Sequence, residues 1–348
     1  MEKEFQPFAI NDIFEIRPGK RLVAADSTPG TRPFIGALDN SNGVARFVSD
    51  SNESLDSNVL GVNYNGNGMV IGFYHPYECI FSDDVKRFHL RDTSDGRDVL
   101  LYVKVPILMQ KSKFGYLYKF NAQRMEKTRV MLPVGDGGEP DWEYMSSSSR
   151  SKREALLARY RQFAGERVSQ LEHVDIPSLD EVTWAPVSVS SMFELIRGRE
   201  SNMATLGSGD TPLISAKKTD NGLKAFVGSS RRVAGHCITL NNDGDGGAGL
   251  AFYQPADMAL DTHVTALYPV EDMSMWSMLF VARCLSGLHG FFGHGLSISN
   301  DRAKKIRIML PVTDESNPDY AYMEQYSKNM MLRKYQQYLD YLDAVSGE

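Results

Sequence analysis

Apolar and polar residues alternate in short runs over two long stretches of the chain, residues 8–134 and 186–312, and Gly, Asn and Pro interrupt the runs. Alternation with a period of two, cut by turn-forming residues, predicts β-strands joined by tight turns. Each stretch also contains a longer apolar segment, residues 99–111 or 275–288, that predicts a helix, although Pro106 should kink the first one. The pattern therefore predicts two units of mixed α and β structure.

A different pattern follows each stretch. From the pair Pro140-Asp141 to about residue 171, and from Pro318-Asp319 to about residue 345, Gly is rare and no further Pro occurs. Pro is tolerated in the first turn of a helix, and an Asp carboxylate suits the positive N-terminal end of the helix dipole. Each Pro-Asp pair therefore predicts the start of a long helix.

Both predicted tail helices carry an apolar stripe that suits packing against another helix. In the second tail the stripe has the 4, 3, 4, 3 spacing of a coiled-coil seam and consists of Met331, Tyr335, Tyr338, Leu342 and Val345. In the first tail the residues that share one face are Leu156, Tyr160 and Phe163. We expect the two helices, each about 28 residues and roughly 40 Å long, to pair as an antiparallel coiled-coil spacer.

The two halves of the chain repeat one another. Phe14-Glu15 returns as Phe193-Glu194, a step of 179 residues that recurs at further matches. After one deletion the step is 178, and the Met-Leu-Pro-Val sequence of residues 131–134 returns at 309–312. A register kept over that length predicts two copies of one fold in tandem.

The repeat and the tails together define the expected fold class. We predict a mixed α/β (α+β) architecture of two tandem domains related by pseudo-two-fold symmetry, each followed by a long helix. The predicted boundaries are 1–139 and 186–316 for the domains, 140–173 and 317–348 for the helices, and 174–185 for the linker. Two like domains on one chain suggest a molecule that grips an extended ligand at two places.

Composition places the chain among ordinary globular proteins, since 42% of its 348 residues are hydrophobic and 24% are charged. The cysteines Cys79, Cys237 and Cys284 form no C-x-x-C pair, which argues against a zinc site or a disulfide framework and for a reducing compartment. The charged start of the chain shows no secretory signal, and Arg283 and His289 interrupt its longest apolar stretch. We therefore expect a cytoplasmic protein.

The formal net charge of −6 weighs mildly against nucleic-acid binding, but the distribution of charge matters more. Residues 104–129 contain seven basic residues and one acidic residue, and the matching place in the second half carries Arg302, Lys304, Lys305 and Arg307. A basic strip on an acidic chain fits a DNA-binding protein that works beside other proteins. The alternative is that both basic segments are solvated surface faces.

Three short motifs are reminiscent of catalytic or metal sites, but local structure explains each of them better. Residues 317–320 (Asn-Pro-Asp-Tyr) resemble the Asn/Asp-Pro-Pro-Tyr tetrad of N6-adenine methyltransferases, but Asp replaces the second Pro and no Gly-rich S-adenosylmethionine loop accompanies them. Neither Pro-Asp pair is followed by the Glu-x-Lys or Asp-x-Lys of a nuclease motif. Residues 242–247 lack the closing Glu of a calcium loop and predict a hairpin turn, which is also suited to contact DNA.

The two halves differ most at their loops. Residues 36–40 (Gly-Ala-Leu-Asp-Asn) are replaced by 215–219 (Ser-Ala-Lys-Lys-Thr), and 113–116 (Lys-Phe-Gly-Tyr) by 291–294 (Phe-Phe-Gly-His). Side chains of Asn, Lys, Arg, Asp and His can read base edges in the major groove. One scaffold with two sets of loops would read two different short sequences; the alternative is neutral drift of surface loops.

The order of these features resembles that of the specificity subunits of bacterial restriction–modification systems, types I and IIB. The matching pieces are Phe-Glu-Ile/Leu at 14–16 and 193–195, the Ala…Asn-Gly loop at 37–43 and 216–222, Phe-Tyr-x-Pro at 73–76 and 252–255, Phe-Gly before Met-Leu-Pro-Val, and the Pro-Asp helix starts. Together they cover nearly the whole chain, twice. The spacer helices look short for type I, which favours the compact type IIB arrangement.

The resemblance implies a non-catalytic subunit that recognises a bipartite, asymmetric DNA duplex with two target-recognition domains. Its helices would position N6-adenine methyltransferase and endonuclease subunits, which are fused in one chain in type IIB systems. No cofactor is then expected on this chain, and S-adenosylmethionine and Mg are expected on the partner subunits. The alternative function is a tandem module that binds protein or glycan, with helices for oligomerisation.

We therefore predict two sets of site residues and no catalytic or metal-binding residue. The residues expected to contact DNA lie in loops and basic clusters: Lys20, Arg21, Leu38, Asp39, Asn40, Asn42, Asn65, Lys111, Lys113, Tyr116, Arg124, Arg199, Lys217, Lys218, Thr219, Asn221, Arg231, Arg232, His294 and Arg302. The residues expected to bind partner subunits lie on the helix stripes: Leu156, Tyr160, Phe163, Tyr335, Tyr338 and Leu342.

Overall fold

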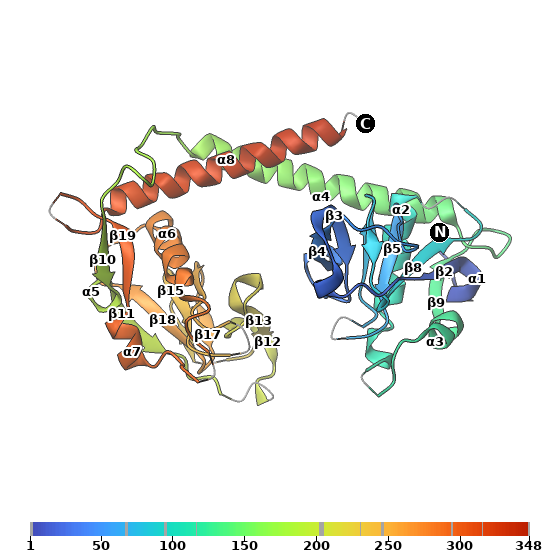
Figure 1. The fold of residues 1–348 in the computed structure, drawn as a ribbon, viewed down its shortest axis with the longest axis horizontal. Helices are drawn as coiled ribbons and strands as arrows, with labels where there is room; N and C mark the ends of the chain where they lie inside the picture. The colour runs from blue at the N-terminus through green and yellow to red at the C-terminus, as the bar shows by residue number, and fades with distance from the viewer. Residues whose placement is uncertain are drawn as a thin grey trace. The chain divides into compact units, whose positions relative to one another are not determined.

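The computed structural model describes residues 3–66, 69–93, 96–115, 117–201, 205–229, 231–244, 247–293, 295–314 and 316–346. The chain forms two compact units, Met1–Tyr160 and Arg161–Glu348, and each contains one copy of the repeat (Figure 1). Within the described residues, no helix is both long enough and apolar enough to cross a membrane.

The first unit is built around a four-stranded antiparallel sheet of order β2-β8-β5-β6. Its strands are β2 (Phe14–Pro18), β5 (Val59–Asn63), β6 (Gly72–His75) and β8 (Val85–Leu90). A second sheet of order β4-β3-β7, in which β3 and β7 are parallel, consists of β3 (Pro29–Ile35), β4 (Val44–Val48) and β7 (Ile80–Phe81). The remaining pair is β1 (Phe5–Ala9) with β9 (Arg129–Pro133).

Helix α2 (Arg97–Leu108) covers the main core of the first unit. Leu100, Val103 and Ile107 lie three or four residues apart, share one face of the helix and are fully buried. Pro106 lies inside α2, and the helix ends at Leu108 shortly after it, so the prediction that it extends to residue 111 was wrong. The other helical segments of this unit are α1 (Ile10–Ile13), α3 (Ala122–Lys127) and 3-10 turns at Ala24–Asp26, Ser41–Gly43 and Lys111–Lys113.

The second unit repeats the topology of the first. Its four-stranded antiparallel sheet has the order β11-β18-β15-β16, and its strands are β11 (Phe193–Arg197), β15 (Cys237–Asn241), β16 (Ala251–Gln254) and β18 (Val264–Pro269). The other sheet, of order β13-β12-β17-β14, contains β12 (Ser208–Ile214), β13 (Leu223–Val227), β14 (Arg232–Val233) and β17 (Met258–Leu260). β10 (Trp184–Ser188) pairs with β19 (Arg307–Pro311).

Helix α6 (Met275–Leu285) covers the core of the second unit as α2 covers that of the first, and its residues Met278, Val281 and Leu285 are fully buried. The prediction that this helix extends to residue 288 was wrong, because a 3-10 turn at Ser286–Leu288 follows it. Further helical segments among the described residues of this unit are α5 (Val189–Met192), α7 (Asn300–Lys305) and a 3-10 turn at Asp220–Gly222.

The tail helices are α4 (Trp142–Gln170) and α8 (Tyr320–Ser346), and the predicted class of two mixed α/β domains, each followed by a long helix, is confirmed. The Asp141 side chain accepts from the Tyr144 N–H at 2.9 Å and so caps α4, and Asp319 caps α8 in the same way. The two prolines do not lie in the first helical turns as predicted. They precede the helices, in bridges between Val134 and Pro140 and between Val312 and Pro318.

The end of α4 packs against α8 within the second unit. The rings of Phe163 and Tyr335 meet edge to face with centroids 6.0 Å apart, and Arg161 Nη2 donates to Leu342 O at 3.2 Å. Further along the chain, the Asn329 side chain donates to Val174 O at 2.7 Å. The position contacted on α8 falls as the residue number on the first segment rises, so the predicted antiparallel direction is confirmed for this part.

Candidate nucleic-acid interface

Three loops of the first unit meet at one end of its main sheet, and we call their described residues the first tip (36–43, 64–71 and 109–121). Asn63 Nδ2 donates to Leu38 O at 2.7 Å and ties the β3–β4 loop to the β5–β6 hairpin. Gly66, with a φ of +73°, lies against Ala37. The loop after α2 joins them at a pocket of about 550 Å³, which is lined by Asn65, Gly66, Met69, Lys111, Phe114, Gly115 and Lys119.

The second unit forms the equivalent second tip from residues 215–222, 242–250 and 286–299. Asn241 Nδ2 donates to Lys217 O at 3.2 Å, and Gly244, with a φ of +102°, lies against Ala216. The Ile298 N–H donates to Asn242 O at 2.7 Å and brings in the third loop. The hairpin predicted at 242–247 is confirmed, because it connects the antiparallel strands β15 and β16.

The 179-residue step of the repeat would align the two hairpins one residue out of register, and the pairing of their strands corrects this alignment. Asn63 pairs with Val85, and Asn241 pairs with Val264. The two valines are 179 residues apart, whereas the two asparagines are 178 apart. One residue is therefore missing before β15, and the hairpin after it restores the register. As a result, Asn65 of the first tip corresponds to Asp243 of the second.

The second tip contains an open pocket of about 780 Å³ that is rich in charge. His263 Nδ1 lies 2.6 Å from Asp243 Oδ1. The ammonium of Lys217 pairs with Asp220, and this hydrogen bond holds the pKa of the exposed Asp220 carboxyl below its usual range. Lys224 of β13 also lines the pocket. Basic and acidic groups therefore surround one space at this tip.

The corresponding groups of the first tip are different. Asn65 Nδ2 donates to Asp84 Oδ1 at 3.1 Å, in the place of the Asp243–His263 pair. The Arg124 guanidinium lies over the ring of Tyr118 at 3.7 Å from its centroid, and that ring stacks on Phe114. An arginine held against an aromatic ring keeps its donors in a fixed orientation.

The structure brings about half of the predicted DNA-contacting residues to the tips with exposed or half-buried side chains. These are Leu38, Asp39, Asn40, Asn65, Lys111, Lys113, Lys217, Lys218 and Thr219. Arg124 belongs to α3, beside the first tip, and lies over the ring of Tyr118. Asn42 and Asn221 have another function, because both have a left-handed φ and their amides donate to Tyr74 O and Tyr253 O in the turn. We therefore leave these two asparagines out of the interface.

Most of the other predicted residues that the structure describes contact neighbours around the tips. Lys20 pairs with Glu53 at 2.8 Å, and Arg21 lies 3.8 Å from Asp83. Arg231 Nη1 donates weakly to Arg199 O at 3.4 Å. The exposed Arg232 belongs to β14, and Arg302 donates to Ser297 O. The predicted residues Tyr116 and His294 lie outside the described residues.

Sequence reasoning missed Lys224, Asp243 and His263 as site residues. Their positions in the chain are far apart, and the pairing of β15 with β18 brings the last two together. Asp243 belonged to a segment interpreted as a hairpin turn suited to contact DNA, but its own side chain was not singled out. One signal in the sequence could have indicated Lys224: it stands in the second half where the first half has Ala45, so the two copies differ in charge at this position.

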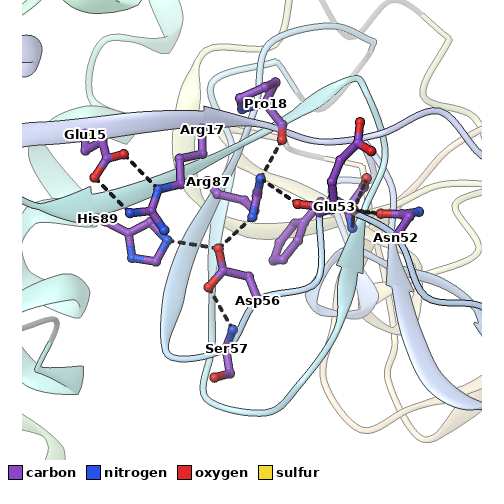
Figure 2. Close-up of polar contacts among 11 residues, drawn as sticks. Glu15, Arg17, Pro18, Asn52, Glu53, Asp56, Ser57, Arg87 and His89 are labelled. Carbon is purple, nitrogen blue, oxygen red and sulfur yellow. Dashed lines mark hydrogen bonds and ion pairs between the residues drawn. The ribbon is translucent and has the colours of Figure 1, made fainter.

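A buried charged cluster in the first unit has a structural function (Figure 2). Arg87 Nη1 donates to Asp56 Oδ2 at 2.8 Å, and His89 Nε2 lies 2.9 Å from the same oxygen. Burial by itself would raise the pKa of Asp56, but His89, the Ser57 N–H and Arg87 outweigh it and hold this pKa below its usual range. Arg87 Nη2 also donates to Pro18 O, so the cluster joins β8, β2 and the segment before β5.

Residues 2–156 and 181–338 both match the family model described as the type I restriction modification DNA specificity domain. One match falls in each unit, and together they span most of the chain. The chain belongs to this family. Each unit therefore carries one copy of a DNA specificity domain, in agreement with the sequence resemblance.

One curated relative agrees with this family, and several solved structures are similar to the chain. The specificity subunit of the type II restriction enzyme BgcI of Heyndrickxia coagulans is 52% identical over 152 residues, which is 44% of this chain and 44% of that protein. The chain thus aligns with less than half the length of this curated relative. The type I S subunit from M. genitalium aligns over 99% of this chain and 94% of its own, with 13% identity and a TM-score of 0.48. The HsdS subunit from Thermoanaerobacter tengcongensis aligns over 98% and 91%, with 12% identity and a TM-score of 0.32.

Proposed function

We propose that this chain is a specificity subunit that reads a bipartite, asymmetric duplex target, one part with each tip. The observation that carries the proposal is the difference between two pockets on one framework. The first contains Asn65 and Lys119, whereas the second contains Lys217, Asp243 and His263. Different donors and acceptors at equivalent places favour different base sequences.

Basic residues around each tip would contact phosphates and set the register on the duplex. Lys113 and Arg124 in the first unit, and Lys218 and Arg302 in the second, have the charge and the exposure for this function. Phosphate contacts carry no sequence information, but they make binding depend strongly on salt.

The paired tail helices would fix the separation of the two tips around a pseudo-two-fold axis. A helix of about 28 residues spans roughly 40 Å, close to the 34–36 Å of one duplex turn. The contact between Phe163 and Tyr335 and the buried Leu342 support pairing at one end of this spacer. Tyr160 and the exposed Tyr338 remain candidates for contact with partner subunits, as the sequence predicted.

An open apolar groove of about 740 Å³ in the first unit suits a partner subunit. The most exposed of its apolar residues come from β1, α2 and the residue after it, β9 and α4, and are between 44% and 73% exposed: Phe5, Val105, Met109, Met131 and Leu156. Lys152 also lines it, as does Arg153, which pairs with Asp98 at 3.3 Å, so an amphipathic segment with an acidic residue for Lys152 beside its apolar ones would fit. We assign it to the methyltransferase partner.

The partner subunits would be an N6-adenine methyltransferase and an endonuclease, either separate or fused in one chain. They would hold S-adenosylmethionine and Mg, and this chain would hold no cofactor. We place the complex in the cytoplasm, and we keep the boundaries 1–139, 140–173, 174–185, 186–316 and 317–348 as the proposed domains, helices and linker.

Two measurements test this function. The affinity of the full chain for a duplex should fall as salt rises, with a logarithmic slope of about −0.9 for each phosphate contact. An affinity that does not respond to salt would favour a protein- or glycan-binding module instead. In cells that also contain the partner subunits, sequencing of methylated DNA should show a motif of two separated blocks. One contiguous block would contradict a bipartite target.

A further inference from the structure

The second tip carries polar groups that match one particular base pair. This inference rests on the proposed function, because it names what one half of the interface recognises. The pocket of the second tip brings together two lysines, Lys217 and Lys224, and the carboxylate of Asp243.

The Asp243 carboxylate is held in place. Its side chain is 23% exposed, and Oδ1 contacts His263 Nδ1. The backbone fixes His263 as well, since its N–H donates to Asp261 Oδ1 at 3.0 Å and its carbonyl accepts from the Asn242 N–H at 2.8 Å. A carboxylate has about four lone-pair sites, so Asp243 keeps acceptor capacity for a ligand while it contacts the histidine.

The two lysines supply donors to the same pocket. The backbone of Lys217 is fixed on both sides, because its N–H donates to Ser215 O and its carbonyl accepts from Asn241 Nδ2. Its ammonium pairs with the exposed Asp220 and donates to Leu223 O at 3.2 Å, and an ammonium has a third donor for a ligand. Lys224 lies on β13 and is exposed.

A G·C pair presents the complementary pattern in the major groove. Guanine offers two acceptors, N7 and O6, and cytosine offers the N4 amino group as a donor. We propose that the second tip reads a G·C pair, with Lys217 and Lys224 donating to guanine and Asp243 accepting from the cytosine amino group. An A·T pair, with adenine in place of guanine, would set the N6 donor of adenine against a lysine and the O4 acceptor of thymine against the carboxylate. A T·A pair would offer the two lysines one acceptor, O4, where guanine offers two.

The first tip lacks this combination at the equivalent positions. Leu38 and Ala45 stand where the second tip has its two lysines. Asn65, bonded to Asp84, stands in the place of Asp243. The base pair at the corresponding point of the first half-site is therefore read differently, and the first tip serves as an internal control.

The test is selection of bound duplexes from a randomised pool by the full chain, followed by sequencing. The wild-type chain should enrich one invariant G·C pair in the half-site of the second tip. Lys224→Ala should reduce the discrimination at that pair alone, by about ten-fold to a hundred-fold. Asp243→Asn should shift the preference there towards T·A, with adenine in place of cytosine, because an Asn amide pairs with adenine N6 and N7. Neither variant should change the sequence that is enriched in the half-site of the first tip.

The matched control is Lys218→Ala, since Lys218 neighbours Lys217 but is not among the described residues that line the pocket. It should weaken binding to all sequences equally. If Lys224→Ala and Asp243→Asn also weaken binding to all sequences equally, or leave the enriched motif unchanged, the assignment of the G·C pair is overturned. The proposed recognition of a bipartite target is not affected by that result. If the wild-type chain enriches no sequence at all, the proposed function itself fails.

Discussion

The two units share one strand order but stabilise it with different side chains. Arg87 and His89 of β8 occupy the ladder positions that Ala266 and Tyr268 occupy in β18. In the first unit both side chains contact Asp56. The first unit therefore buries the charged Arg87 at the position where the second unit buries Ala266. The fold therefore does not require the charged cluster, but a buried charge, once present, needs its partner.

A second exchange lies in β6 and β16. His75 is fully buried, and its ring nitrogens make no hydrogen bond with any residue in the described part of the chain. Its counterpart Gln254 donates to Thr239 Oγ1 at 3.0 Å and to Asn221 O at 2.9 Å. The second unit thus satisfies a buried polar group that the first leaves unsatisfied, and the two units should respond differently to mutation and to pH.

The largest effect is expected for Asp56→Ala. The variant leaves the buried guanidinium of Arg87 without its carboxylate, which should lower the free energy of unfolding of the first unit by about 3–5 kcal/mol. Chemical denaturation followed by the fluorescence of Trp142 measures this, in a background where Trp184 and Trp276 of the second unit are replaced by Phe. The second unit should unfold as in the parent chain.

The double variant Asp56→Ala/Arg87→Ala sharpens the same comparison. It removes both charges and places at position 87 the residue that β18 carries as Ala266. We expect it to be more stable than Asp56→Ala, because no uncompensated charge remains. A double variant as unstable as the single one would show that lost packing, and not an unpaired charge, explains the loss.

The next effect concerns acid stability. Burial, with a smaller contribution from the charge of Lys104, lowers the pKa of His75 from 6.5 to about 4. Below pH 6.5 the histidine binds a proton in the unfolded chain but stays neutral in the folded unit, so stability is lost as the pH falls from 6.5 to about 4. The loss amounts to roughly 3 kcal/mol. Urea unfolding of the first unit at pH 7 and at pH 4.5 measures most of it.

His75→Gln, which introduces the residue of the second unit, separates this group from other acid effects. The variant should remove most of the difference between the two pH values, whatever it does to stability at pH 7. If the first unit of the variant loses as much stability on acidification as the parent, another titrating group is responsible.

The sequence predicted the parts of this molecule that depend on local pattern. The repeat located equivalent strands, and Asp141 does cap its helix, because capping involves residues only three positions apart. The deletion of one residue before β15 could not be detected from the sequence, because the repeated motifs before and after it are both 179 residues apart. The pocket of the second tip could not be predicted, because its charges come from separate loops that only strand pairing brings together. Asn42 was misread because a left-handed turn also needs an Asn.

A smaller effect, on assembly, is expected for Leu156→Lys. Leu156 is 63% exposed in the apolar groove of the first unit, and its counterpart in the second half is Lys334. The change should leave the free energy of unfolding within about 0.5 kcal/mol. It should weaken binding to the methyltransferase partner at least about ten-fold if the groove is the docking site. Calorimetric titration of the partner measures this; unchanged affinity would move the docking site elsewhere.

The smallest effect concerns the pairing of the tail helices. Phe163 of α4 and Tyr335 of α8 meet edge to face, a geometry that contributes about 0.5–1.5 kcal/mol beyond the area it buries. A double-mutant cycle of Phe163→Ala and Tyr335→Ala should give a coupling energy of this size in the unfolding of the second unit. Tyr341→Ala, at a position that is 57% exposed, is the control and should couple with neither. A coupling near zero between Phe163 and Tyr335 would mean that this contact does not hold the helices together, and a fixed spacing of the two tips would then need another cause.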